Sequence, residues 1–189
     1  MLEALAVSTG VVALGEMGDK TQLLALLLAA RFRKPWPIMA GILVATLANH
    51  ALAAALGTWL TRNIDPQWMR WVLGGSFIAV ALWMLVPDRA EEVQAEGTGR
   101  WGVFGITLIA FFLAEMGDKT QVATVMLAAR YDAIVAVTAG TTLGMMIANV
   151  PAVLLGDRVV RWVPIAWVHR VAALVFAGLG VAVLLGAAG

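Results

Sequence analysis

The chain contains 189 residues, of which 61% are hydrophobic and only 13% are charged, and its formal net charge is +1. Since a soluble domain carries about 25% charged residues, this composition and the long apolar runs indicate an integral membrane protein. The charge gives no reason to expect a nucleic-acid partner. A chain without cysteine has neither disulfides nor thiolate metal ligands.

Six apolar runs have the length that a helix needs to cross a bilayer, which is about 20 residues for ~30 Å of hydrocarbon. The sequence therefore predicts an all-α membrane protein with six transmembrane helices, at about 2–30, 36–60, 68–86, 101–129, 133–155 and 165–185. The first run has no basic segment before it and continues far beyond the apolar core of a signal peptide. We therefore expect it to remain as a permanent span.

The polar stretch 88–100 is the longest in the chain and contains Glu91, Glu92 and Glu96. It is expected to be an acidic linker loop between two three-helix repeats, residues 1–87 and 101–189, that form one membrane domain. A constant shift of 99 positions, without gaps, matches Glu16 to Glu115, and the same shift aligns identical residues along the whole half. Three spans per half is an odd number, so the second repeat is expected to be inverted relative to the first, with a site at the midplane between them.

Lysine and arginine residues in the loops predict the orientation, because they concentrate on the cytoplasmic side. With the N-terminus outside, the outer loops contain only Arg62, Arg70 and Arg130. The inner loops then contain the larger set: Arg31, Arg33, Lys34, Arg89, Arg100, Arg158, Arg161 and Arg170. Both termini are therefore predicted to lie outside.

The seven residues Glu-Met-Gly-Asp-Lys-Thr-Gln occur twice, at 16–22 and 115–121, within the first and fourth apolar runs. A charged side chain at the centre of a membrane helix costs roughly 2.5–3.5 kcal/mol, so such residues indicate an ion or proton pathway. On a continuous helix the Glu and Asp of each motif would share a face. Gly18 and Gly117 would permit either close approach of another helix or a local break.

Meeting at the midplane, the two motifs would place four carboxylates in one cavity: Glu16, Asp19, Glu115 and Asp118. Such hard oxygen ligands suit magnesium, calcium or manganese(II). With Lys20 and Lys119 as compensating charges, two negative charges remain, which one divalent cation or two protons would neutralise. We therefore hypothesise metal–proton exchange. An alternative is that each lysine pairs with its own glutamate and the helices merely lock together.

Further polar residues in the apolar runs are candidates for the metal site or its pathway, although each has an alternative as an interhelical hydrogen-bond partner. In the motifs and in the second and fifth runs these are Thr21, Gln22, Thr120, Gln121, Asn49, His50 and Asn149. His169, near the start of the sixth run, is expected at the membrane interface.

Two copies of Glu-x-Gly-Asp-Lys-Thr, each on the first span of a three-span repeat, resemble the Gdt family of cation/proton antiporters over nearly the whole chain. The resemblance implies that Glu16, Asp19, Glu115 and Asp118 bind a divalent cation, manganese(II) or calcium, that leaves the cytosol in exchange for protons. The lack of an extended N-terminal segment favours a bacterial member in the cell inner membrane. The metal is then substrate rather than cofactor, and no resident cofactor is expected. The sequence leaves open whether the chain forms a homo-oligomer.

Three other functions compete with this interpretation. An exporter of a small organic cation, such as a basic amino acid, would use the paired carboxylates to hold an ammonium group. An intramembrane enzyme lacks obvious parts, because the only serines, Ser8 and Ser76, have no nearby base in sequence. A purely structural membrane protein would not need two buried acid clusters in register.

Overall fold

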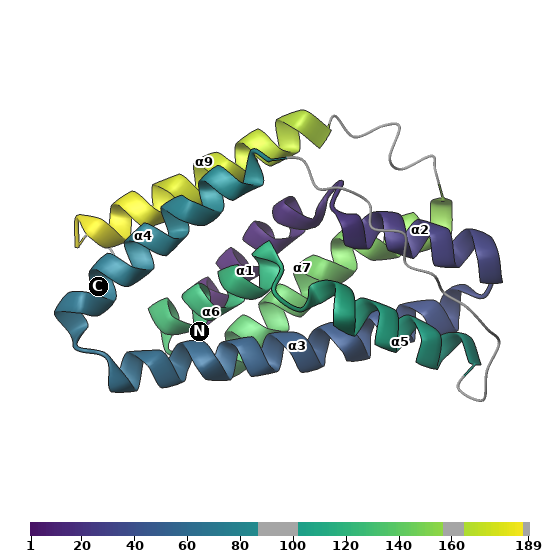
Figure 1. The fold of residues 1–189 in the computed structure, drawn as a ribbon, viewed down its shortest axis with the longest axis horizontal. Helices are drawn as coiled ribbons and strands as arrows, with labels where there is room; N and C mark the ends of the chain where they lie inside the picture. The colour runs from purple at the N-terminus through teal and green to yellow at the C-terminus, as the bar shows by residue number, and fades with distance from the viewer. Residues whose placement is uncertain (87–101, 157–164, 187–189) are drawn as a thin grey trace.

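The computed structural model describes residues 1–86, 102–156 and 165–186 (Figure 1). In these ranges the chain forms eight helices and no strand, so the prediction of an all-helical protein is confirmed. The helices are α1 (Leu2–Glu16), α2 (Lys20–Phe32), α3 (Pro35–Asn63), α4 (Pro66–Met84), α5 (Gly102–Glu115), α6 (Lys119–Tyr131), α7 (Ile134–Leu155) and α9 (Ile165–Leu184). The predicted acidic linker at 88–100 lies outside the described residues.

Three of the described helices are long and apolar enough to cross a membrane: α3 with 29 residues, α7 with 22, and residues Ala166–Leu184 of α9. Their length and apolar composition agree with the membrane protein that the overall composition predicts. The predicted bounds of these spans agree with the helices to within a few residues. Pro35 and Pro66 stand in the first turns of α3 and α4, where a missing N–H costs nothing, and so mark where those helices begin.

The predicted runs at 2–30 and 101–129 are each interrupted within the repeated motif, so the expectation of one continuous helix in each is wrong. The helix α1 ends at Glu16 and α2 begins at Lys20, while α5 ends at Glu115 and α6 begins at Lys119. Gly18 and Gly117 have φ angles of 83° and 75°, in the left-handed region that glycine adopts most readily. Of the two roles considered for these glycines, the helix break is the one that occurs.

Most of the packing between helices joins one half of the chain to the other, with smaller contacts inside each half. The helix α1 packs on α7, and α3 packs on α5 and α6 (Figure 1). Close crossings depend on small residues: a Cβ on Gly140 or Gly144 of α7 would lie 2.6 Å from the Leu5 carbonyl oxygen or 2.7 Å from that of Thr9. This small-xxx-small spacing is typical of membrane helices in close contact.

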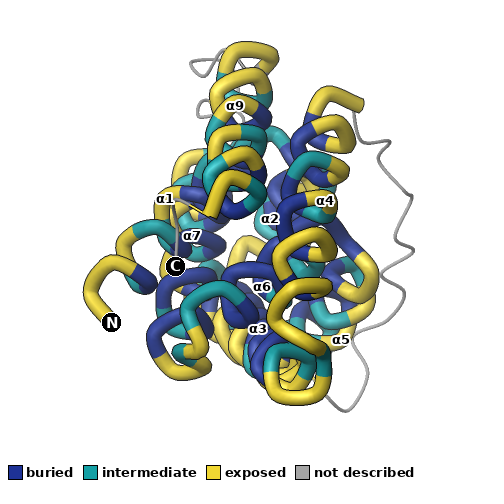
Figure 2. The backbone as a smooth tube through the Cα atoms, turned by 90° about the vertical axis from the view of Figure 1, so that its left-hand side faces the viewer, coloured by how far each residue is buried: buried dark blue, intermediate teal, exposed yellow. Residues whose placement is uncertain are grey.

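The helices α4 and α9 form a pair along one edge of the molecule (Figure 1). Their contact includes Phe77 and Phe176, whose ring centroids are 6.2 Å apart. The pair meets the other helices mainly through α6 and α1. Figure 2 shows exposed positions on the outer turns of both helices and buried positions facing the middle of the bundle. The exposed side chains of Trp68, Trp71 and Trp167 are consistent with a surface that faces lipid.

Candidate metal site

The two helix breaks bring carboxylates from both copies of the motif together. One carboxylate oxygen each from Glu16, Asp19 and Asp118 lies within 4.8 Å of the others, and all three residues are buried. Glu115 is also fully buried, and it ends α5 at the break that contains Asp118. The structure thus assembles all four predicted acidic residues in one region, although not by the shared helix face that a continuous helix would provide.

The geometry of each break explains how residues three apart in sequence come together. At the first break the Asp19 amide donates to the Glu16 carbonyl oxygen at 3.1 Å, and at the second the Asp118 amide donates to the Glu115 carbonyl oxygen at 3.2 Å. Asp19 and Asp118 then occupy the N-cap positions of α2 and α6. The positive end of a helix dipole favours negative charge there, so the fold itself stabilises the two aspartates.

A glutamine closes each break in the same way. The side-chain oxygen of Gln22 accepts from the Gly18 amide at 2.9 Å, and that of Gln121 accepts from the Gly117 amide at 2.7 Å. Gln22 also donates its side-chain amide to the Ala148 carbonyl oxygen at 2.9 Å, which ties the first break to α7. Both glutamines therefore act as hydrogen-bond partners that hold the breaks, and their oxygens face the backbone.

The two threonines of the motifs serve the same glutamate. Thr21 donates to one carboxylate oxygen of Glu16 at 2.6 Å, and Thr120 of the other repeat donates to the second oxygen. Among the described residues, neither carboxylate oxygen of Glu115 accepts a hydrogen bond. Instead, one of them lies 3.8 Å from Nε2 of His50, which is also fully buried. The equivalent glutamates of the two motifs thus have unlike surroundings.

The lysines extend from the cluster in different directions. Nζ of Lys20 lies 3.5 Å from a carboxylate oxygen of Asp118, so this ion pair crosses between the two repeats. Nζ of Lys119 donates to the Val86 carbonyl oxygen at 3.4 Å, just beyond the end of α4. Lys20 therefore pairs with an aspartate of the other repeat, whereas Lys119 connects its motif to the end of α4.

The remaining predicted polar residues divide between the site and the helix packing. His50 reaches Glu115, but Asn49 donates to the Phe112 carbonyl oxygen at 3.0 Å, and Asn149 donates within α7 to Met145. The contact of His169 with the first break is not anticipated by the sequence: its Nε2 lies 3.0 Å from the Met17 carbonyl oxygen. The sequence signal that could have drawn attention to His169 is the repeat shift, which matches it to Arg70, so that both positions have a basic side chain.

The arrangement has the properties of a site for a hard divalent cation. Its ligands would be carboxylate oxygens, which magnesium, calcium and manganese(II) prefer over the nitrogen and sulfur donors that soft metals take. The cluster is buried and has more acidic than basic groups, so an added cation would offset the cost of holding carboxylates together away from water.

Comparisons with known proteins bear on both repeats. The model of a family described as "Divalent cation/proton antiporter GDT1" matches residues 4–92 and 103–189. A protein of Vibrio cholerae named "Putative manganese exporter" is 50% identical over 177 residues, which cover 93% of this chain and 88% of the relative. A GDT1-like protein of Synechocystis is 28% identical over 84% of this chain and 85% of its own length. A rice protein, GDT1-like protein 3, is 27% identical over 96% and 73%. No solved structure matches the chain.

Proposed function

The chain belongs to the GDT1 family of divalent cation/proton antiporters and is a divalent cation transporter, and from this premise we propose that it exports manganese(II) from the cytoplasm in exchange for protons. The name of the Vibrio cholerae relative supports manganese(II) as the cargo. Calcium, which shares the same oxygen chemistry, is the second candidate. Transport by a family of this class is not catalysis, and the proposal assigns the chain no enzymatic role.

The observation that carries the proposal is the buried cluster of carboxylates drawn from both helix breaks. Glu16, Asp19 and Asp118 offer three oxygens within 4.8 Å of one another, and the buried Glu115 ends α5 at the same break as Asp118. We assign these four residues as the metal ligands, with the Thr21 and Thr120 hydroxyls positioning Glu16 and with Lys20 offsetting part of the charge.

Exchange with protons follows from the charges in the cluster. Four carboxylates and two lysines leave two negative charges uncompensated when all six groups are ionised. One divalent cation neutralises both charges, and so do two protons, so metal and protons compete for the same oxygens. Such competition would couple the two fluxes.

The membrane arrangement belongs to the same proposal. Each helix of the first half corresponds to one of the second half at a shift of 99 positions, and the broken pair α1–α2 would form one span, as would α5–α6. Six spans in two inverted repeats would place the breaks at the midplane from opposite sides, which is a recurring transporter design. We place the chain in the bacterial inner membrane with both termini outside.

Metal uptake into proteoliposomes under an imposed pH gradient tests the function. Wild-type protein should accumulate manganese(II) only with the gradient, and Glu16→Gln and Glu115→Gln should each lower the rate at least about tenfold, since even groups that only support a metal ligand alter affinity by about 10–100-fold. Glu3→Gln is the matched control, because Glu3 lies exposed on α1, far from the break in sequence.

Three outcomes would contradict parts of the proposal. Unchanged manganese(II) flux in both glutamine variants would remove the carboxylates from the pathway. Flux that ignores the pH gradient would remove the proton. Folded wild-type protein that moves lysine or arginine but neither metal would make the chain an organic-cation exporter, and the carboxylates would be a site for an ammonium group.

A further inference from the structure

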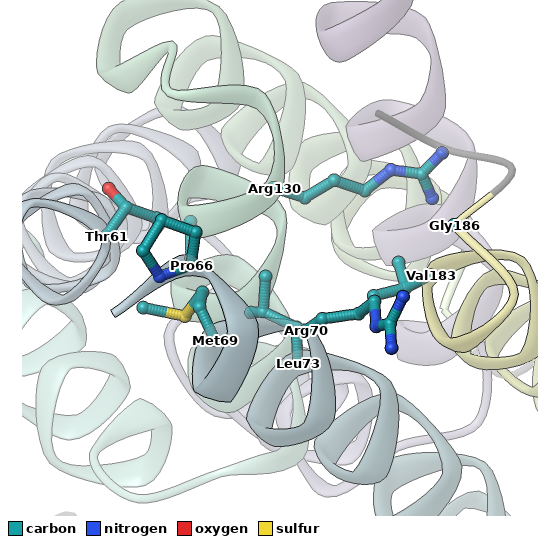
Figure 3. A pocket seen from close by; sticks show the side chains of 9 residues that line it. Thr61, Pro66, Met69, Arg70, Leu73, Arg130, Val183 and Gly186 are labelled. Carbon is teal, nitrogen blue, oxygen red and sulfur yellow. The ribbon is translucent and has the colours of Figure 1, made fainter. Parts of the chain in front are cut away.

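A cavity of about 380 Å³ lies away from the carboxylate cluster, where the start of α4, the end of α6 and the end of α9 meet (Figure 3). Most of its wall is apolar and includes Met69, Leu73 and Val183. Two arginines also line it, Arg70 from α4 and Arg130 from α6. None of the described residues that line this cavity is acidic.

The two guanidinium groups extend toward the end of α9, where Val183 and Gly186 lie (Figure 3). A Cβ built on Gly186 would lie 3.9 Å from Nη1 of Arg70, which shows how closely that guanidinium approaches the helix end. Each group also lies against an aromatic ring, with Cζ of Arg130 5.1 Å from the centroid of Tyr131 and Cζ of Arg70 5.5 Å from that of Trp71. Ring contacts orient a guanidinium without using its N–H donors in the plane.

Arg130 has a donor that the described protein does not satisfy. Its Nη1 is buried and has no hydrogen-bond partner among the described residues. Burying such a donor without a partner is unfavourable, and more so for a charged group. A ligand that brings acceptor oxygens into the cavity would remove this cost.

We propose that this cavity binds an anionic phospholipid, with the phosphodiester between Arg70 and Arg130 and the acyl chains along the apolar wall. Guanidinium groups bind phosphate oxygens through paired, charge-assisted hydrogen bonds. The cavity lies at helix ends, the level at which lipid headgroups meet a membrane protein. The apolar wall favours a lipid over free phosphate, because an inorganic ion would leave that wall uncovered.

The bound lipid would contact three helices at once. The helix α4 contributes Arg70, α6 contributes Arg130, and the α9 end closes the cavity. The lipid would therefore act as a bridge between the α4–α9 pair and the helix that carries the second motif. This role does not depend on which cation the protein transports.

Lipid titration of the purified, delipidated protein tests the site. We expect phosphatidylglycerol to raise the thermal unfolding temperature of the wild type, and phosphatidylcholine and inorganic phosphate to have little effect. Native mass spectrometry should show phosphatidylglycerol retained by the wild type. The double variant Arg70→Gln/Arg130→Gln should bind it at least about tenfold more weakly, since hydrogen bonds to charged groups are lost.

Arg62→Gln is the matched control, because Arg62 is an exposed arginine on the last turn of α3 and does not line this cavity. It should bind phosphatidylglycerol like the wild type. Because Arg70 is exposed, the single variant Arg70→Gln is expected to fold even where the double variant does not, and it should show an intermediate loss. Equal retention of phosphatidylglycerol by wild type and the Arg70 variants would overturn the proposal. So would equal stabilisation by phosphatidylcholine, or stabilisation by phosphate alone, which would indicate a site for a free anion.

Discussion

Glu16 and Glu115 occupy equivalent positions in identical motifs, yet they have different partners. Glu16 accepts hydrogen bonds from threonines of both repeats, whereas Glu115 faces His50. The shift of 99 positions matches His50 to Asn149, so the second repeat supplies no imidazole at the corresponding place. The duplicated motif therefore places its two glutamates in unlike surroundings, and one part of the difference, the imidazole beside Glu115, comes from a residue outside the motif.

His50 is expected to affect which metal the site prefers. Calcium takes only oxygen ligands, whereas manganese(II), although it prefers carboxylates, is a first-row transition ion that also binds at sites with a nitrogen ligand, so the imidazole beside Glu115 would favour manganese(II) over calcium. His50→Asn, which introduces the residue found at the matched position, should lower the preference for manganese(II) over calcium on the order of fivefold, or about 1 kcal/mol. Competition of calcium against manganese(II) uptake in proteoliposomes measures this preference.

The control for that experiment is Thr46→Ser, a buried position one turn earlier on α3. It should leave the ratio of the two metals unchanged. If His50→Asn weakens the binding of both metals by the same factor, His50 only supports the packing around Glu115 and does not discriminate between cations.

The helix packing depends on glycines that admit another backbone. A Cβ on Gly57 of α3 would lie 2.1 Å from the Val125 carbonyl oxygen of α6, a backbone atom that cannot yield without moving the helix. By contrast, a Cβ on Gly75 of α4 would have no neighbouring atom within 4 Å among the described residues. The two glycines are thus a matched pair, both inside helices, that differ in whether a neighbour contacts them.

Substitution by alanine should destabilise the protein at Gly57 but not at Gly75. Gly57→Ala should lower the free energy of unfolding by about 1–3 kcal/mol, because overpacking forces α3 and α6 apart. Gly75→Ala should leave it unchanged or raise it by up to about 1 kcal/mol, since alanine favours helix. Thermal unfolding of the two purified variants in detergent gives the comparison. Equal shifts would show that the α3–α6 crossing is looser than the structure indicates.

The positions of the helices could be predicted from the sequence, but the break in each motif could not. Apolar length locates spans, and Pro35 and Pro66 mark helix starts, because these signals are local. Gly18 is consistent with both a close crossing and a break, and the choice depends on Gln22 reaching the Gly18 amide in the folded chain. The repeated motif was enough to predict that the four acidic residues come together. Their individual hydrogen-bond partners could not be predicted, because Thr120 reaches Glu16 only through tertiary packing.

At the scale of the whole molecule, the α4–α9 pair contacts both motif breaks at one of its ends. Lys119 donates to the Val86 carbonyl oxygen after α4, and His169 at the start of α9 contacts the Met17 carbonyl oxygen. The repeat shift matches this second contact to Arg70 and Met116. Arg70 instead lines the lipid cavity, and Met116 is 57% exposed. The pair therefore closes over the breaks at one end only.

We expect that during transport the His169–Met17 contact opens and the matching contact between Arg70 and Met116 forms in its place. In this chain without native cysteines, Met17→Cys/His169→Cys should cross-link with a short bifunctional reagent in the present state, and Met116→Cys/Arg70→Cys in the opposite one. If the pair rocks between the two ends, manganese(II) should change the two yields in opposite directions, as alternating access by rigid-body motion requires. Yields that rise or fall together would show that the α4–α9 pair is a fixed scaffold.

The contacts that cross between the repeats can form only after the second half of the chain has been synthesised. Thr120 lies 104 residues beyond Glu16, and the ion-pair partner of Lys20 is Asp118 of the later half. A ribosome therefore delivers the first break to the bilayer well before its partners exist, with buried charges still unmatched. The first half would have to wait in the insertion machinery or near the headgroups, and a chain released before the second motif would be a target for membrane quality control rather than half of a transporter.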